Sequence, residues 1–178
     1  MAFAETPETE TALPIARPDP KRPLHLLATG FGSGLINPAP GTWGSLAAIP
    51  FILALHQLSL PVYLLVLAIS AIAGIWLCGV VARDLGVDDH QAIVWDEFVG
   101  MGITLAIMPP GMILPAVILG FLLFRLFDIV KPGPIGWLDK NLKGGAGIMM
   151  DDILAGIFAL LSLVFILGLY RWITAPSL

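Results

Sequence analysis

The stretch GGAGIMMDDILAGIFALLSLVFILGLY, residues 144–170, decides the class of fold. Its last 18 residues, 153–170, carry no charged side chain, and an α-helix needs roughly 20 mostly apolar residues to cross the hydrocarbon core of a bilayer. Asp151 and Asp152 stand directly before this apolar run. The pattern predicts a membrane-spanning helix that begins beside an acidic pair.

The rest of the chain is equally apolar. Of 178 residues, 57% are hydrophobic and only 12% are charged, and the mean hydropathy of +0.90 is far from that of a soluble globular protein. Four further apolar stretches cover residues 44–60, 62–81, 98–108 and 112–129, of which 98–108 is the shortest. Because backbone groups in hydrocarbon must pair within each segment, we expect an all-α integral membrane protein, a bundle of about four to five transmembrane helices.

The N-terminal region has a different composition. Residues 1–23 are rich in Pro, Thr, Glu and Ala and lack a basic segment followed by an apolar run, so we expect a flexible polar tail rather than a cleaved signal peptide. Residues 24–178 then form one polytopic membrane domain. The single cysteine, Cys78, lies in an apolar run and can form neither an intramolecular disulfide nor a thiolate metal cluster.

The basic residues predict the orientation. Seven of the nine fall before the first span, at the end of the second or after the fourth: Arg17, Lys21, Arg22, Arg83, Lys131, Lys140 and Lys143. With five spans, all seven lie on one side, which the positive-inside rule makes the cytoplasmic side. The same topology brings the polar segments 29–45, 83–97 and 125–152 to that side. We therefore expect a site built from loops and helix ends at the cytoplasmic membrane surface.

The first candidate motif is acidic. Asp88, Asp89 and His90 precede an apolar helix whose first turn would hold Asp96 and Glu97. The helix dipole favours anions in the first turn, so capping of the helix is one interpretation. Two adjacent acids at the edge of hydrocarbon are costly without a cation, which favours a metal site.

The second motif lies near the cytoplasmic end of the fourth span. Arg125, Asp128 and Lys131 are spaced by three residues, so neighbouring members share one helical face. The two basic side chains could extend to the interface and neutralise Asp128. Alternatively, Arg and Lys could bind phosphate oxygens while Asp128 holds a metal.

Two further motifs are rich in glycine. Lys143 and residues 144–147 would form a turn before Asp151 and Asp152, where backbone amides approach an anion and the acids suit Mg²⁺. The segment 40–45, Pro-Gly-Thr-Trp-Gly-Ser, ends where the first span begins. Its hydroxyls could cap a helix or bind phosphate. The candidate phosphate ligands here are Thr42, Ser45, Lys143, Gly144, Gly145 and Gly147.

The charges of these motifs point to one chemistry. Nine of the 13 carboxylates lie between Asp84 and Asp152, which calls for divalent cations, while the basic groups and glycine amides call for an anion. Mg²⁺ with phosphate satisfies both requirements, and metal-assisted phosphoryl chemistry uses this combination of groups.

In this order, the motifs resemble those of the phosphatidylglycerophosphatase A family: Gly-Thr-Trp-Gly-Ser from Gly41, Val-Trp-Asp-Glu from Val94, Arg-Leu-Phe-Asp-Ile-Val-Lys-Pro from Arg125, and Gly-Gly-Ala-Gly-Ile-Met-Met-Asp-Asp from Gly144. The resemblance covers about residues 24–172. It implies a multi-pass enzyme of the bacterial inner membrane that depends on Mg²⁺. Such an enzyme hydrolyses phosphatidylglycerophosphate to phosphatidylglycerol and inorganic phosphate at the cytoplasmic face.

The site hypothesis follows from the motifs and the resemblance together. The expected metal ligands are Asp96, Glu97, Asp128, Asp151 and Asp152. The expected phosphate ligands are Arg125, Lys131, Lys143, Gly144, Gly145, Gly147, Thr42 and Ser45. The expected catalytic residues are Asp96, Asp128 and Asp152, with His90 or Asp89 transferring protons. The nucleophile is a water molecule or a carboxylate, which would form a phospho-aspartyl intermediate.

Other functions fit the sequence less well. The Asp-Gly-x-x-Ala-Arg string typical of CDP-alcohol phosphotransferases does not occur. A transporter would carry charges near the centres of its spans, whereas here they fall at span ends. We expect a lipid substrate in the membrane and no nucleic-acid partner, and the oligomeric state stays open.

Overall fold

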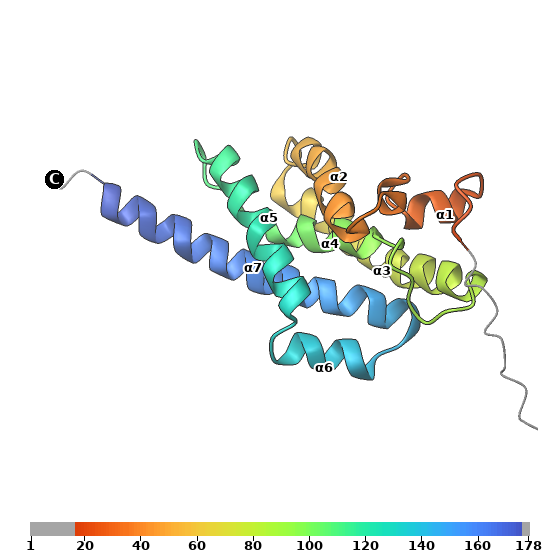
Figure 1. The fold of residues 1–178 in the computed structure, drawn as a ribbon. Helices are drawn as coiled ribbons and strands as arrows, with labels where there is room; N and C mark the ends of the chain where they lie inside the picture. Colours follow the sequence, from red (N-terminus) through yellow and green to blue (C-terminus); the bar gives the residue numbers. More distant parts are fainter. Residues whose placement is uncertain (1–16, 176–178) are drawn as a thin grey trace, which may run out of the picture.

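A computed structural model describes residues 17–175, and this part of the chain consists of helices and connecting loops without a strand (Figure 1). The elements in chain order are α1 (Pro23–Ala28), the 3₁₀ turn η1 (Ser33–Leu35), α2 (Pro40–Leu55), α3 (Leu60–Asp84), α4 (Trp95–Thr104), α5 (Ile113–Val130), α6 (Pro134–Asn141) and α7 (Gly144–Thr174). The expected all-α class is confirmed for the described residues.

Each apolar stretch of the sequence contains one helix, but the helices differ in length. Within residues 17–175, only α3, α5 and α7, with 25, 18 and 31 residues, are long and apolar enough to cross a membrane. Helix α2 has 16 residues and ends at Leu55, before the turn that leads to α3. Helix α4 has only 10 residues and is followed by the Pro109-Pro110-Gly111 turn. The count of about four to five spans therefore exceeds the three helices of spanning length.

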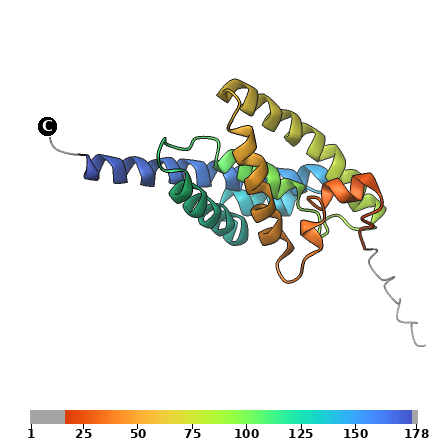
Figure 2. The ribbon, with the colours of Figure 1, turned by 90° about the horizontal axis from the view of Figure 1, so that it is seen from above.

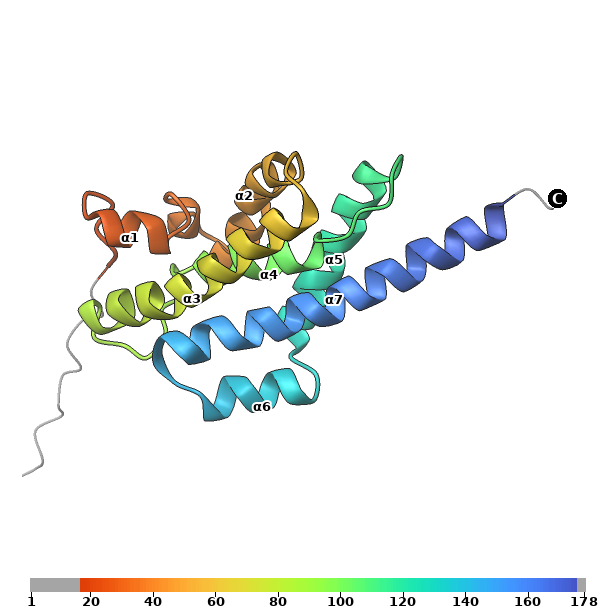
Figure 3. The same cartoon turned by 180° about the vertical axis from the view of Figure 1, so that it is seen from behind.

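Helix α7 is the central element, and α3, α4, α5 and α6 all pack against it (Figures 1 and 3). Small residues bring the backbones close together. A Cβ added at Gly156 would lie 2.5 Å from the carbonyl oxygen of Gly100 in α4, and one at Gly145 would collide with the carbonyl oxygen of Ile75 in α3. Small residues at such crossings are typical of helices that pack within membranes.

Short helix α4 is enclosed by its neighbours, with contacts to α2, α3, α5 and α7. Its residues Val99, Met101 and Thr104 are almost completely buried. The first turn of α4 carries Asp96 and Glu97, which are therefore brought into the interior of the helix bundle rather than to its surface. This position of α4 determines where the site forms.

One expectation about local structure is wrong. Residues 144–147 were expected to form a glycine-rich turn before the last span, but α7 already begins at Gly144. A tight helix crossing explains the difference, because Gly145 packs directly on α3 and a side chain there would not fit. Likewise, Thr42 and Ser45 belong to α2 rather than to a loop before it.

The expected N-terminal tail lies mostly outside the described residues. At its end, Arg22 forms an ion pair of 2.7 Å with Asp84 at the end of α3. The backbone N–H of Asp19 donates to Nδ1 of the buried His25, which also lies 3.3 Å from Asp84. These contacts attach residues 19–25 to the end of α3.

Candidate active site

A polar cavity of about 270 Å³ lies where the polar segments of the sequence meet. The start of α2, the loop between α3 and α4, the first turn of α4, the end of α5 and the start of α7 contribute its walls. The polar side chains that line it are Asp89, Gln91, Asp96, Glu97, Arg125, Asp128, Lys131, Asp151 and Asp152. All five expected metal ligands are thus brought together around one cavity.

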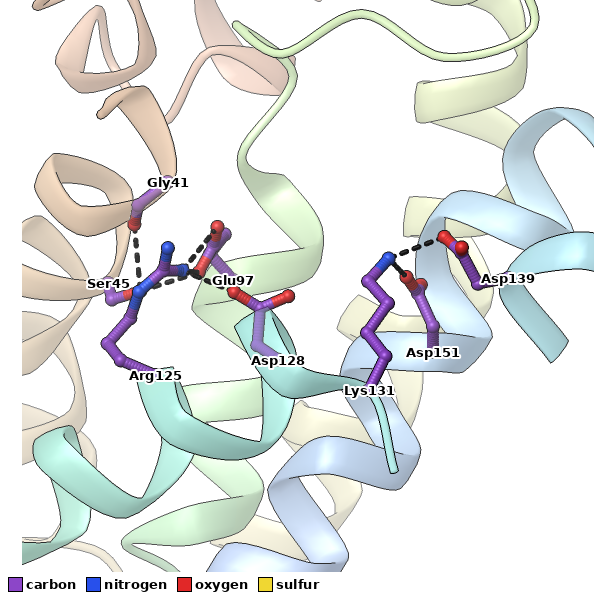
Figure 4. Close-up of polar contacts among 8 residues, drawn as sticks. All are labelled: Gly41, Ser45, Glu97, Arg125, Asp128, Lys131, Asp139 and Asp151. Carbon is purple, nitrogen blue, oxygen red and sulfur yellow. Dashed lines mark hydrogen bonds and ion pairs between the residues drawn. The ribbon is translucent and has the colours of Figure 1, made fainter. Parts of the chain in front are cut away.

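Glu97 and Arg125 form the most buried ion pair of this cavity (Figure 4). Nη1 of Arg125 lies 2.9 and 2.7 Å from the two carboxylate oxygens of Glu97, and 2.6 Å from Oδ2 of Asp128. The three side chains are only 10–15% exposed. Arg125 therefore neutralises two carboxylates that come from different helices and holds them in fixed positions.

Local sequence explains this arrangement. Arg125 and Asp128 are three residues apart on α5 and so share a face, and Glu97 lies in the first turn of α4, where the helix dipole favours a negative charge. Burial raises the pKa of the Glu97 carboxyl, and the Arg125 guanidinium opposes this rise. The hydroxyl of Ser45 donates to Oε2 of Glu97 at 2.5 Å.

Gly41 lets α2 approach this ion pair. A Cβ at position 41 would collide with Oε1 of Glu97 and lie 3.1 Å from Nη1 of Arg125. The carbonyl oxygen of Gly41 also lies 2.8 Å from the Ser45 hydroxyl (Figure 4). Position 41 therefore requires glycine for steric reasons, a role that the sequence alone did not single out.

Lys131 occupies a second position in the cavity wall. Its Nζ lies 2.5 Å from Asp139 of α6 and 2.6 Å from Asp151 of α7 (Figure 4). Burial alone would lower the pKa of this ammonium group, but its hydrogen bonds to the two carboxylates raise the pKa overall. Lys131 therefore carries a positive charge that faces the cavity.

In the described part of the chain, three carboxylates have a buried oxygen without a partner. Oδ1 of Asp96, Oδ1 of Asp151 and Oδ2 of Asp152 are buried and accept no hydrogen bond. Desolvation and the neighbouring Glu97 raise the pKa of Asp96. Buried polar atoms normally have partners, so these oxygens favour a positively charged ligand in the cavity.

The donor set is suited to a hard cation such as Mg²⁺, which prefers carboxylate and water oxygens. Among residues 17–175, no three His, Cys, Asp or Glu side chains already converge closely enough to enclose an ion. The chemistry of the ligands therefore fits Mg²⁺, although their side chains would have to turn towards the ion.

Several expected site residues lie elsewhere. His90 lines a separate cavity with Arg17 and Asn37, and its Nδ1 accepts a hydrogen bond from the backbone N–H of Ala92. The side chain of Thr42 is absent from the lining of the polar cavity. Of the two residues considered for proton transfer, Asp89 alone lines that cavity.

Lys143, Gly144 and Gly147 line a neighbouring polar cavity of about 190 Å³. The two cavities share Asp89 and Asp151 in their walls. The glycine-rich segment thus lies beside the main cavity rather than in it. Lys143 is largely exposed and lies 3.2 Å from Asp88.

Sequence reasoning missed Gln91, which lines the main cavity, and Asp139, which pairs with Lys131. Asp139 is separated from the acidic pairs and belongs to α6, a short helix without a long apolar run. A polar residue in a loop, such as Gln91, gives no periodic signal. Neither residue could have been selected by spacing.

Comparison with known proteins identifies the family. The family described as Phosphatidylglycerophosphatase A matches residues 26–167. The phosphatidylglycerophosphatase A of Escherichia coli (strain K12) is 51% identical over 144 residues, which cover 81% of this chain and 83% of the relative. The protein of the same name from Haemophilus influenzae is 50% identical over 140 residues, covering 78% of this chain and 85% of the relative.

A third relative, from Bacteroides thetaiotaomicron, carries the provisional name phosphatidylinositol-3-phosphatase. It is 39% identical over 163 residues, which cover 86% of this chain and 98% of the relative. No solved structure matches the chain. The matched region includes the whole polar cavity, from Ala39 to Asp152. The chain therefore belongs to the phosphatidylglycerophosphatase A family and is a phosphatase.

Proposed function

We propose that this phosphatase hydrolyses phosphatidylglycerophosphate to phosphatidylglycerol and inorganic phosphate during phospholipid biosynthesis. The observation that carries the proposal is the acidic cavity at one end of long apolar helices, in a chain that is about half identical to two enzymes of that name. A phosphate group would enter the polar cavity while the lipid part stays beside the helices.

We further propose that the enzyme is an inner-membrane protein whose cavity faces the cytoplasm. Helices α3, α5 and α7 have spanning length, and α5 and α7 expose large apolar side chains such as Leu114, Leu122 and Phe165. Basic residues lie in the last turn of α3 and beyond the end of α5, on the side of the cavity: Arg83, Lys131, Lys140 and Lys143. Their position supports this orientation through the positive-inside rule.

Mg²⁺ is the proposed cofactor. Asp96, Asp151 and Asp152, whose unpartnered oxygens need a positive charge, would hold it together with Asp128 and Glu97. Bound Mg²⁺ supplies Lewis-acid stabilisation of the charge on phosphate oxygens. The separate carboxylates on α4, α5 and α7 offer enough oxygen ligands for one or two ions.

The basic groups would orient the phosphate. Lys131 presents its charge to the cavity, and Arg125 retains a buried Nε–H without an acceptor, which can donate to a phosphate oxygen. For attack by water, the water oxygen would bond to phosphorus, the bond from phosphorus to the lipid oxygen would break, and protonated Asp89, which lines the cavity, would donate a proton to this leaving oxygen. The proton that the attacking water loses would pass to an oxygen of the released phosphate, and Asp89 would be reprotonated from solvent.

The test is phosphate release from phosphatidylglycerophosphate in detergent micelles, with and without Mg²⁺, by the wild type and by a folded Asp152→Asn variant. We expect Mg²⁺-dependent release that the variant loses. Absence of release by folded wild type would contradict the proposed substrate. Phosphatidylinositol 3-phosphate is the second substrate to compare, because the Bacteroides relative is provisionally named as a phosphatidylinositol-3-phosphatase. Preferential cleavage of this lipid would change the assigned headgroup.

A further inference from the structure

A further cavity, of about 390 Å³, lies between α2, α3 and α4. Helices α2 and α3 diverge from the turn that joins them, as Figure 2 shows. The volume falls in the range of about 300–1,000 Å³ that is typical of small-molecule sites. We call this cavity the α2–α3 groove and define it by Ala54, Leu55, Val66, Leu67, Phe98 and Gly102, which are among its lining residues.

The groove presents an almost purely apolar surface. Among its lining residues only Ser70 and Trp95 carry a polar group in the side chain. The indole N–H of Trp95 already donates to the backbone oxygen of Ser70 at 3.2 Å. A polar ligand would therefore lose its hydrogen bonds to water here, whereas a hydrocarbon chain would not.

Aromatic rings form one end of the groove. The rings of Phe31 and Phe51 stack with centroids 5.3 Å apart, and Phe51 lies 5.7 Å from Phe98, which in turn stacks on Trp95. Phe31 and Phe51 are 50% and 49% exposed, so this end is open to the surroundings of the protein. The opening provides a way in for a chain from the apolar surroundings of the helices.

The groove and the active site share helix α4. Trp95 and Phe98 line the groove, and the two residues between them, Asp96 and Glu97, line the polar cavity. Helix α2 also contributes to both cavities, since Gly41 lines the polar cavity and Ala54 lines the groove. A molecule with a phosphate headgroup and a hydrocarbon chain matches these two adjoining surfaces.

We propose that the α2–α3 groove binds an acyl chain of the lipid substrate, so that the enzyme selects substrates by their chain as well as their headgroup. The proposal rests on the proposed function, since it concerns the same lipid. Filling the groove should weaken the use of long-chain lipids and leave short-chain lipids largely unaffected.

Ala54→Phe tests this proposal, because Ala54 lines the groove and is exposed, so a larger side chain can enter without disturbing the core. Ala68→Phe is the matched control, an exposed alanine of α3 that is not among the lining residues. For dipalmitoyl phosphatidylglycerophosphate we expect Ala54→Phe to lower kcat/KM about tenfold. This is the change expected when about two methylene groups of the acyl chain can no longer be buried in the groove. The dihexanoyl lipid should be hydrolysed as by the wild type. Equal losses for both lipids, or no loss for either, would overturn the proposal.

A second measurement needs no turnover. In a variant that keeps Trp95 and carries Trp43→Phe, Trp76→Phe, Trp137→Phe and Trp172→Phe, a phosphatidylglycerophosphate with brominated acyl chains should quench the fluorescence of Trp95. Adding Ala54→Phe should reduce the quenching, and adding Ala68→Phe should not. Unchanged quenching with Ala54→Phe would contradict the groove. If the wild type releases no phosphate, the proposed function fails, and quenching alone then decides whether the groove binds the chain.

Discussion

Arg125 and Glu97 lie 28 residues apart in the sequence, yet Nη1 of Arg125 is within 2.9 Å of both carboxylate oxygens of Glu97. The pair joins α5 to α4 beside the polar cavity, and Asp128 shares the same guanidinium. Removing one partner of a buried ion pair leaves the other charge without compensation, which is costly. Arg125 is thus a stabilising residue of the bundle as well as a candidate phosphate ligand.

Arg125→Leu should therefore lower both stability and activity. We expect the free energy of unfolding to fall by about 3–5 kcal/mol, the usual cost of breaking a buried pair, and phosphate release to be lost. Thermal unfolding in detergent measures the first effect. Arg83→Leu, at the exposed end of α3, is the control and should unfold close to the wild-type temperature. Equal stability of the two variants would contradict the structural role of Arg125.

Ser45→Ala should have a smaller effect. The variant loses the hydroxyl that donates to Glu97, and a hydrogen bond to a charged group contributes about 1.5–3 kcal/mol. We expect a lower unfolding temperature and reduced kcat. Ser162→Ala removes a hydroxyl that donates to the backbone carbonyl of Phe158 within α7 and has no bond to a carboxylate, so it should cost less. A larger effect of Ser162→Ala would show that Ser45 does not support Glu97.

Gly41→Ala tests the close approach of α2 to the ion pair. The added methyl group would collide with Oε1 of Glu97, so Glu97 must move away from Arg125 and activity should fall at least about tenfold, or about 1.4 kcal/mol. Gly168→Ala is a suitable control, since its Cβ meets no atom within 4 Å and alanine favours the helix. Steady-state hydrolysis by the two variants provides the comparison. Full activity of Gly41→Ala would mean that the position of Glu97 is not critical.

Mg²⁺ should stabilise the protein against heat. A ligand that binds only the folded state at about 100 times its Kd adds about 2.7 kcal/mol. We expect Mg²⁺ to raise the unfolding temperature of the wild type, EDTA to reverse the rise, and Asp152→Asn to abolish it. Asp139→Asn alters a carboxylate outside the proposed metal ligands and should keep the response to Mg²⁺. A Mg²⁺ response that persists in Asp152→Asn would move the ion to other ligands.

Asp89→Asn and His90→Ala separate the two candidates for proton transfer. Asp89 lines the polar cavity and His90 lines a different one, so we expect Asp89→Asn to lower kcat by about 10²–10⁴-fold, the usual contribution of general acid–base catalysis. His90→Ala should retain most of its activity. The opposite ranking in a phosphate-release assay would assign the proton transfer to His90.

Much of the helical structure could be predicted because long apolar runs leave few alternatives. The runs that became α3, α5 and α7 were expected to be helical, since a segment in hydrocarbon has no water to pair with its backbone. The short apolar run 98–108 already indicated that α4 is short. Its enclosure by α2, α3, α5 and α7 could not be read from hydropathy, which does not distinguish an apolar helix inside a bundle from one that faces lipid. The helical start of α7 at Gly144 depends on its contact with α3, which no local pattern reveals.

Some features of the candidate site could likewise be predicted from the sequence and others could not. Charged residues avoid hydrocarbon, so Asp96, Asp128 and Asp152 were expected at one membrane surface, and they do line one cavity. The direction of a loop side chain depends on tertiary contacts, so the sequence could not distinguish Asp89 from His90. The steric requirement for glycine at position 41 became visible only with Glu97 in place.

The crossing of α4 and α7 also bears on which ion the protein can accept. A Cβ at Gly100 would lie 2.9 Å from the backbone oxygen of Asp152, so the two helices touch through their backbones at this point. Helix packing then fixes the separation between the backbones that carry Asp96 and Asp152, so their carboxylates can approach an ion only as far as the side chains turn. Ca²⁺ is larger than Mg²⁺ and takes more ligands at longer distances, and selectivity between the two depends on the size and rigidity of the site. Gly100 and Gly156 would therefore help the proposed site to select Mg²⁺ over Ca²⁺, because they keep α4 and α7 close together. Neither residue has a side chain that could bind the ion.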